Sequence, residues 1–160
     1  ELKVPVQKIK SLVLGGHGDS MVAMLGSTEV DGKKINDLVK EGRLSKDKLN
    51  QIVDRTKKGG AEIVKFLEKG SAFYAPAASG VEMAECYLKD LKKQLPCAVY
   101  LNGEYGAKDI YAGVPVIIGS DGVEKIIELE LSNEEKTNFE KSIEAVKELF
   151  SAAKNIDPSL

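Results

Sequence analysis

The chain has 160 residues, of which 42% are hydrophobic, and 23 basic against 25 acidic side chains give a formal net charge of −2. This is an ordinary globular composition, long enough for one domain with its own core. The absence of a basic surplus and of Trp argues against nucleic-acid binding. No apolar run approaches the roughly 20 residues of a membrane helix, and the start, ELKVPVQ, lacks a signal-peptide core, so we expect no membrane association.

The first part of the chain predicts short strands and one short helix. An apolar run over 9–14 is strand-like, and a second extended segment follows over 21–28. Asp31-Gly32 is a hairpin signal. Residues 35–40 have a helical pattern that Gly42 ends.

Two longer helical patterns follow. Ser45 is placed to cap the first, whose apolar positions continue to residue 67 with an interruption at Gly59-Gly60. Two adjacent glycines cost a helix about 2 kcal/mol relative to alanine, so we expect a break. A kink and the close approach of another backbone, such as that of a partner subunit, explain it equally well.

The second pattern has Pro76 in its first turn and ends at Pro96, and its apolar stripe predicts a core face. The stripe consists of Val81, Ala84, Leu88, Leu91 and Leu95.

The remaining residues predict three antiparallel strands and a closing helix. Strands are expected over 97–101 and 114–118, and apolar residues alternate with Glu over 127–131, the pattern of a sheet with one wet face. A turn or bulge lies between the first two strands, and a Gly-Ser-Asp-Gly hairpin follows the second. Residues 132–135 form a capping box for a helix that Asp157-Pro158 ends. Its apolar face consists of Phe139, Ile143, Val146 and Phe150. The order of elements predicts one α+β domain over 1–160, an antiparallel sheet packed with long helices.

The two cysteines, Cys86 and Cys97, do not form a metal-binding pair. They lie in a helical and a strand pattern, and the chain has too few Cys and His residues for a zinc site. We therefore expect no metal and two buried free thiols. Such thiols are typical of the reducing cytoplasm, which is the expected location.

The only histidine, His17, lies in the glycine-rich stretch VLGGHGDS at 13–20. Glycine permits a tight turn and lets a ligand approach the backbone closely, and histidine is the usual proton donor and acceptor near neutral pH. A proton-transfer residue and a structural turn histidine remain equally open. Asp19, two residues on, either orients the imidazole or stabilises the turn. The sequence contains no phosphate-binding loop, dinucleotide fingerprint or serine nucleophile motif to decide between them.

Five ordered blocks of sequence resemble the C-terminal half of malate dehydrogenases, in the bacterial group built like lactate dehydrogenase. They are GGHGDSMV at 15–22, RTKKGGAEIV at 55–64, GSAFYAPAAS at 70–79, EMAECYLKDLKK at 82–93 and the sheet region at 100–131. The resemblance implies the C-terminal domain fold of that family. It also implies NAD-dependent, reversible oxidation of (S)-malate to oxaloacetate by a homodimer or homotetramer.

The resemblance assigns roles to three residues. His17 matches the catalytic histidine, which accepts the hydroxyl proton of malate and returns it to the ketone in the reverse direction. Ala72 and Pro76 match small, non-polar positions that line the substrate and nicotinamide pocket.

Other parts of the family pattern are expected upstream of Glu1. They are the N-terminal Rossmann domain that holds most of NAD, the carboxylate that orients the histidine and the arginines that bind the substrate carboxylates. We therefore expect the 160 residues alone neither to bind NAD well nor to turn over malate. Two alternatives remain: an L-lactate dehydrogenase of the same family, and a non-catalytic assembly module.

Overall fold

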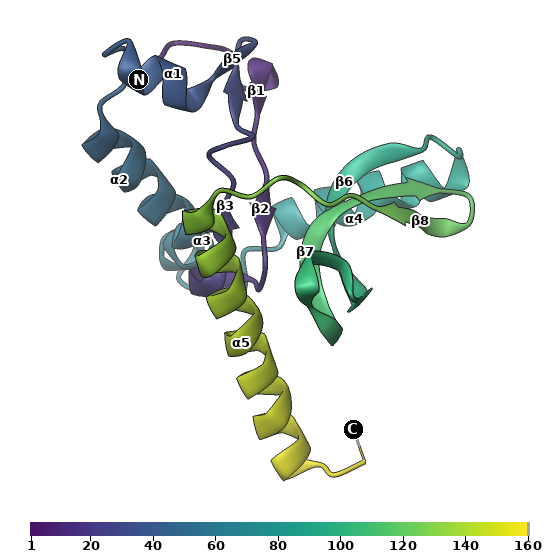
Figure 1. Ribbon diagram of the computed structural model, residues 1–160. Coiled ribbons are helices and arrows are strands. Elements are labelled where there is room, and N and C mark those ends of the chain that lie inside the picture. Colours follow the sequence, from purple (N-terminus) through teal and green to yellow (C-terminus); the bar gives the residue numbers. More distant parts are fainter. Residues whose placement is uncertain (160) are drawn as a thin grey trace.

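The computed structural model describes residues 1–159, and Figure 1 shows the arrangement of their helices and strands. The first strands are β1 (Ile9–Lys10), β2 (Val13–Leu14), β3 (Val22–Ala23), β4 (Glu29–Val30) and β5 (Lys33–Lys34). The helices are α1 (Ile35–Lys40), α2 (Lys46–Lys57), α3 (Gly59–Leu67), α4 (Tyr74–Leu88) and α5 (Asn133–Ile156). The long strands are β6 (Lys93–Asn102), β7 (Lys108–Gly119) and β8 (Gly122–Ile126). All strand pairings in this part of the chain are antiparallel, which confirms the α+β class.

The largest sheet has the order β6-β7-β8. Its register places Tyr100 opposite Tyr111 and Pro96 opposite Pro115. The separate β2–β3 pair attaches to this sheet through an antiparallel backbone bridge between Gly15 and Gly113. The bridge brings the turn after β2 to the middle of β7, far along the sequence.

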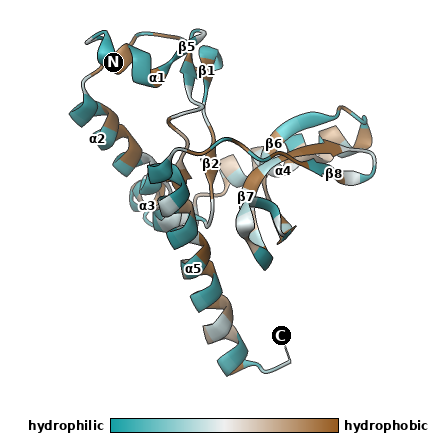
Figure 2. Ribbon diagram, in the orientation of Figure 1, coloured by the Kyte–Doolittle hydropathy of each residue, from teal (hydrophilic) through white to brown (hydrophobic). Residues whose placement is uncertain are grey.

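The main hydrophobic core lies between this sheet, the β2–β3 pair and the helices α4 and α5. Its fully buried side chains include Leu14, Met24, Leu101, Val114 and Phe139. Figure 2 shows hydrophobic residues along β2 and the large sheet, with polar residues over much of α5. A smaller cluster under β4, α1 and α2 consists of Val30, Ile35, Leu38, Leu44 and Leu49.

The last helix is fixed at its N-terminus by the predicted capping box. Ser132 and Glu135 exchange hydrogen bonds between side chain and backbone amide, at 2.9 and 3.2 Å. Glu135 also accepts a hydrogen bond from the Gly26 amide at 2.9 Å, which ties the helix to the segment after β3. Phe139 and Ile143 of the predicted apolar face are buried, whereas Phe150 is 49% exposed because this end of α5 extends beyond the sheet (Figure 1).

The predicted break at Gly59-Gly60 is confirmed, because α2 ends at Lys57 and α3 begins at Gly59. Arg55 spans the break and donates two hydrogen bonds to Glu62, at 2.9 and 2.7 Å. Ser45 caps α2 as predicted, accepting a hydrogen bond from the Lys48 amide at 3.1 Å.

The prediction for the second long helix is wrong in extent and in burial. The helix α4 ends at Leu88, not at Pro96, because Asp90 and Lys92 adopt left-handed backbone angles (φ 48° and 49°) that reverse the chain. Leu95 and Pro96 belong to β6, an edge strand, where proline is tolerated. The predicted core stripe on α4 is also mostly exposed, and the buried residue of this helix is Cys86.

The extended stretches at 127–131 and 9–14 differ from the prediction as well. The side chains of 127–131 alternate between half-buried and exposed as predicted, but the stretch is not part of a strand, because β8 ends at Ile126. The Ile127 amide still donates to the Pro115 carbonyl of β7 at 2.8 Å. Beyond that bond the Tyr105 hydroxyl takes the place of a partner strand, donating to the Ile127 carbonyl at 2.6 Å and accepting from the Leu129 amide at 2.9 Å. The run 9–14 divides into β1 and β2 because they pair with different strands, β4 and β3. The segment 21–28 is likewise a strand only at β3.

Both cysteines are buried and unpaired, as predicted. Burial raises the pKa of the Cys97 thiol, which keeps it in the neutral form. Within residues 1–159, no group of three or more His, Cys, Asp and Glu residues is arranged to hold a metal ion. None of the described helices combines the length and apolarity needed to cross a membrane.

Candidate functional site

The turn that carries His17 begins where β2 ends and closes in the 3-10 turn Gly18–Ser20. His17 has an extended backbone, with φ −83° and ψ 150°, and its side chain is exposed. The Met21 amide closes the turn by donating to the Gly18 carbonyl at 3.1 Å. The turn lies against α2 and α5, so two helices and a sheet surround it.

The sheet holds one side of the turn through paired backbone hydrogen bonds. The Gly15 amide donates to the Gly113 carbonyl, and the Gly113 amide donates to the Gly15 carbonyl, both at 2.8 Å. A Cβ on Gly113 would lie 2.9 Å from the Gly15 oxygen, closer than such atoms pack. The two backbones can therefore approach this closely only because residue 113 is glycine.

The helix α5 holds the other side of the turn. The Gly16 amide donates to the Ser142 hydroxyl oxygen at 2.8 Å, and Ser142 is only 2% exposed. Gly15 has a left-handed φ of 90°, and a Cβ there would lie 2.2 Å from the Ser142 oxygen. Gly15 is therefore required by close packing and by its backbone angle.

The imidazole of His17 is left without a protein partner in the described part of the chain. It makes no hydrogen bond or salt bridge there. Asp19 is also exposed and forms neither kind of bond with the imidazole. The idea that Asp19 orients the ring therefore has no support in the structure. An exposed ring on a firmly held turn is free to exchange a proton with a bound molecule.

Ala72 and Pro76 lie on a different segment. Ala72 is half-buried in the connection between α3 and α4, and Pro76 is exposed in the first turn of α4. No hydrogen bond in residues 1–159 links this segment to the turn of His17. The structure therefore places His17 and the segment of Ala72 and Pro76 in the same described chain without a hydrogen bond between them.

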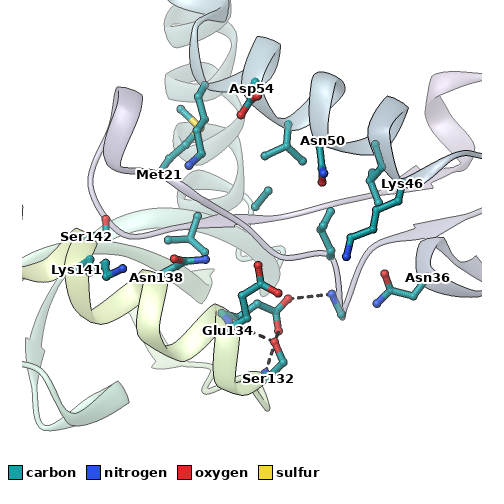
Figure 3. A pocket seen from close by; sticks show the side chains of 18 of the residues that line it. Met21, Asn36, Lys46, Asn50, Asp54, Ser132, Glu134, Asn138, Lys141 and Ser142 are labelled. Atoms are coloured by element: carbon teal, nitrogen blue, oxygen red, sulfur yellow. Dashed lines mark hydrogen bonds between the residues drawn. The ribbon is translucent and has the colours of Figure 1, made fainter. Parts of the chain in front are cut away.

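A cavity of about 950 Å³ opens beside the turn, between α2, α5 and the segment from Asp19 to Gly26 (Figure 3). Its wall includes Lys46 and Asp54 from α2, and Glu134 and Asn138 from α5, so both charge signs face it. None of the three predicted site residues lines this cavity.

The carboxylate of Glu135 is part of the same wall, and its pKa has two opposing causes. Burial raises the pKa, but hydrogen bonds from the Gly26 amide and from the amide and hydroxyl of Ser132 outweigh that effect and lower it. The hydrogen bonds from Gly26 and Ser132 therefore stabilise the charged form of this carboxylate.

The sequence prediction missed the two residues that hold the turn, Gly113 and Ser142. Ser142 had a readable signal, because it is a polar residue beside Phe139 and Ile143 on the apolar face of the last helix. A buried polar side chain must find a hydrogen-bond partner. Gly113 had the weaker signal of a glycine directly before the strand predicted over 114–118.

Comparison with known proteins gives a consistent family match. The family described as lactate/malate dehydrogenase, alpha/beta C-terminal domain, matches residues 1–156. A protein of Pelagibacter ubique named malate dehydrogenase is 64% identical over 160 residues, which is 100% of this chain and 50% of that protein. A malate dehydrogenase of Caulobacter vibrioides is 56% identical, covering 98% of this chain and 49% of that protein.

Solved structures give the same result for the fold. The crystal structure of Cryptosporidium parvum malate dehydrogenase has a TM-score of 0.93 at 42% identity, covering 96% of this chain and 49% of that one. A lactate dehydrogenase from Eimeria maxima, solved with NADH and oxamate, also has a TM-score of 0.93, at 40% identity, covering 98% and 49% of the two chains. This chain therefore spans about half the length of the relatives that it matches.

Proposed function

Because the chain belongs to the lactate/malate dehydrogenase family and has the fold of its C-terminal domain, we propose that residues 1–160 are the catalytic domain of an NAD-dependent malate dehydrogenase. In this role His17 accepts and donates the proton in the reversible oxidation of (S)-malate to oxaloacetate. The observation that carries the proposal is the exposed imidazole without a protein partner, on a turn held by the sheet and by α5.

The proposed reaction divides between the domain and the cofactor. NAD, when bound, supplies the acceptor for the hydride that leaves C2 of malate. His17 takes the hydroxyl proton, so that the C–O bond becomes the ketone and the imidazole becomes imidazolium. In the reverse direction the imidazolium polarises the ketone and returns the proton. The anchored backbone of the turn keeps the ring in one place through both steps.

We propose that the residues of this domain contact one end of NAD. Ala72 and Pro76 are small and uncharged, and we propose that they form a dry wall for the nicotinamide and the substrate. In residues 1–159 no glycine-rich loop connects a strand to a long helix, the arrangement that cradles a pyrophosphate. We therefore assign most of NAD binding to the part of the relatives' length that this chain does not span.

Replacement of His17 in the complete protein tests the catalytic role. His17→Asn should abolish malate turnover with an unchanged circular dichroism spectrum. Because the imidazole has no partner in the described residues, the free energy of unfolding should change by less than about 0.5 kcal/mol. A folded variant that keeps full turnover would contradict the proposal, whereas loss of turnover would exclude a non-catalytic assembly module.

Lactate dehydrogenase remains the second candidate, since structures with that name are 40% identical to this chain. We favour malate because the relatives at 64% and 56% identity are named malate dehydrogenases. Steady-state reduction of oxaloacetate and of pyruvate by the complete protein separates the two. A higher kcat/KM for pyruvate would reverse the choice.

The domain alone should be inactive, because the groups that clamp substrate and cofactor are assigned elsewhere. We expect the 160-residue chain to oxidise NADH with oxaloacetate at less than about a hundredth of the complete enzyme's rate. A faster rate would place the whole site within these residues.

We also propose a cytoplasmic homodimer or homotetramer. The two buried, unpaired thiols suit a reducing compartment, and the exposed apolar side chains of α3 and α4 offer a surface for assembly.

A further inference from the structure

Ser142 is the buried polar side chain that bonds to the turn of His17. Thr28 bonds to the Met24 carbonyl and to the Ser11 hydroxyl. Glu135 closes the capping box and accepts a hydrogen bond from the Gly26 amide, outside the turn. Ser142 instead accepts a hydrogen bond from Gly16, 126 positions earlier in the chain. The local structure of α5 does not need this hydroxyl, since the helix continues for more than three turns beyond it.

The contact at Ser142 leaves the turn little freedom. The position of a Cβ on Gly15 would be 2.2 Å from the Ser142 oxygen and 2.8 Å from its Cβ, so the Gly15-Gly16 backbone lies directly on this side chain. Gly113 holds the opposite edge through two hydrogen bonds of 2.8 Å. His17 follows at the next residue, and its own side chain adds no anchor within the described chain.

We propose that Ser142 is a positioning residue for proton transfer, which it serves by fixing the backbone next to His17. The inference rests on the proposed function of His17. Removal of the hydroxyl leaves the Gly16 amide without its partner and opens space beneath the turn, so the imidazole loses its fixed place relative to the substrate. Displacement by about 1 Å can cost a reaction two orders of magnitude.

The first test is Ser142→Ala in the complete, NADH-binding protein. We expect kcat per active site, with sites titrated by NADH fluorescence, to fall about tenfold or more, with KM for oxaloacetate within about twofold. The primary isotope effect on kcat with deuterated NADH should rise or stay at its full value, because the chemical step becomes slower. Ser151→Ala is the matched control, since it removes an exposed hydroxyl from the same helix and should change neither quantity.

A merely structural role predicts a different result. Ser142→Ala would then lower the unfolding temperature or the number of active sites but leave kcat per site unchanged. That outcome would overturn the inference.

The same substitution in the His17→Asn variant separates this inference from the proposed function. In His17→Asn, residual turnover at high enzyme concentration should not fall further when Ser142→Ala is added, because the positioned group is gone. A further tenfold loss would show that Ser142 acts through something other than His17. If His17→Asn keeps full turnover, the proposed function fails; if only His17→Asn lowers kcat per site, the function stands and the role of Ser142 fails.

Discussion

Three glycines and one serine hold the backbone around His17, whose side chain makes no hydrogen bond or salt bridge in the described residues. Gly15 and Gly16 let the backbone lie against Ser142, and Gly113 receives the other edge. Substitutions at these backbone positions should therefore disturb the turn more than a change of the imidazole does.

Gly15→Ala should destabilise the protein strongly. The left-handed φ of 90° costs a non-glycine residue about 1–2 kcal/mol, and the clash with Ser142 adds about 1–3 kcal/mol of overpacking. Urea unfolding followed by circular dichroism measures the sum. Gly32→Ala is the control, because Gly32 has a φ of 79° but open space around its Cβ position. Equal losses in the two variants would show that the contact with Ser142 costs nothing.

Glu135 should make stability depend on pH on the acid side. Its pKa is lowered in the folded protein, so its contribution is complete above the unfolded value of about 4.3 and is lost as the pH falls through the lowered folded value. Urea unfolding between pH 6 and pH 2, an interval of about four units around that value, should show this decline.

Glu135→Gln should flatten the decline, whereas Glu134→Gln, which removes an exposed charge from the same helical turn, should leave it in place. An unchanged pH profile in Glu135→Gln would contradict the role of this carboxylate.

The helices α2 and α3 form two pieces of one interrupted helix. The bidentate Arg55–Glu62 pair spans the interruption, but both side chains are accessible to solvent, where such pairs add little. A Cβ on Gly59 or Gly60 would meet nothing within 4 Å, and neither has a left-handed φ. Packing within this chain therefore does not require either glycine.

Gly60→Ala should stabilise the 160-residue chain, because alanine favours a helix by about 1 kcal/mol over glycine. The midpoint of urea unfolding should rise. If the same change destabilises the complete, assembled protein, another backbone approaches Gly60 there, as the second explanation of the glycine pair requires. A loss of stability in the isolated chain would mean that the break itself needs glycine.

Features set by near neighbours were predictable from the sequence. The capping box of Ser132 and Glu135, the Asp31-Gly32 hairpin and the helix break each depend on residues within a few positions of one another. The end of α4 could not be predicted from the sequence, because the apolar spacing continues past Leu88 into β6. Only the backbone reversal ends the helix.

In the candidate site, too, local features could be predicted from the sequence and long-range contacts could not. His17 could be selected from its glycine setting. Ser142 could be noticed as a polar residue on an apolar helix face, but its bond to Gly16 and the bonds of Gly113 to Gly15 could not be identified, because they depend on the tertiary fold. The substrate-pocket roles of Ala72 and Pro76 came from resemblance alone and remain predictions.

The molecule as a whole exposes a large apolar surface along α3 and α4. Phe66 is 78% exposed, Tyr74 75%, Val81 69% and Leu88 79%. The α4 stripe has the spacing of a core face and yet faces outward from the described chain. Surfaces of this kind are typical of interfaces, in agreement with the proposed assembly.

The isolated 160-residue chain should associate in solution through this surface. Light scattering should give an average mass above 17.3 kDa that increases with protein concentration. Leu88→Lys should reduce the association, whereas Val6→Lys, which changes an equally exposed apolar residue outside α3 and α4, should not. A clean monomer at high concentration would contradict the prediction.

The bridge between Gly15 and Gly113, with the bond from Gly16 to Ser142, also has a consequence for the order of folding. Contacts between residues this far apart form late, because a long loop must close before they bring any gain. On the ribosome the turn of His17 emerges before β7 and α5, and it is not anchored on both sides until α5 has been synthesised. The part of the chain made early thus acquires its final geometry last, so a nascent chain halted before Ser142 would present the histidine on a loose loop.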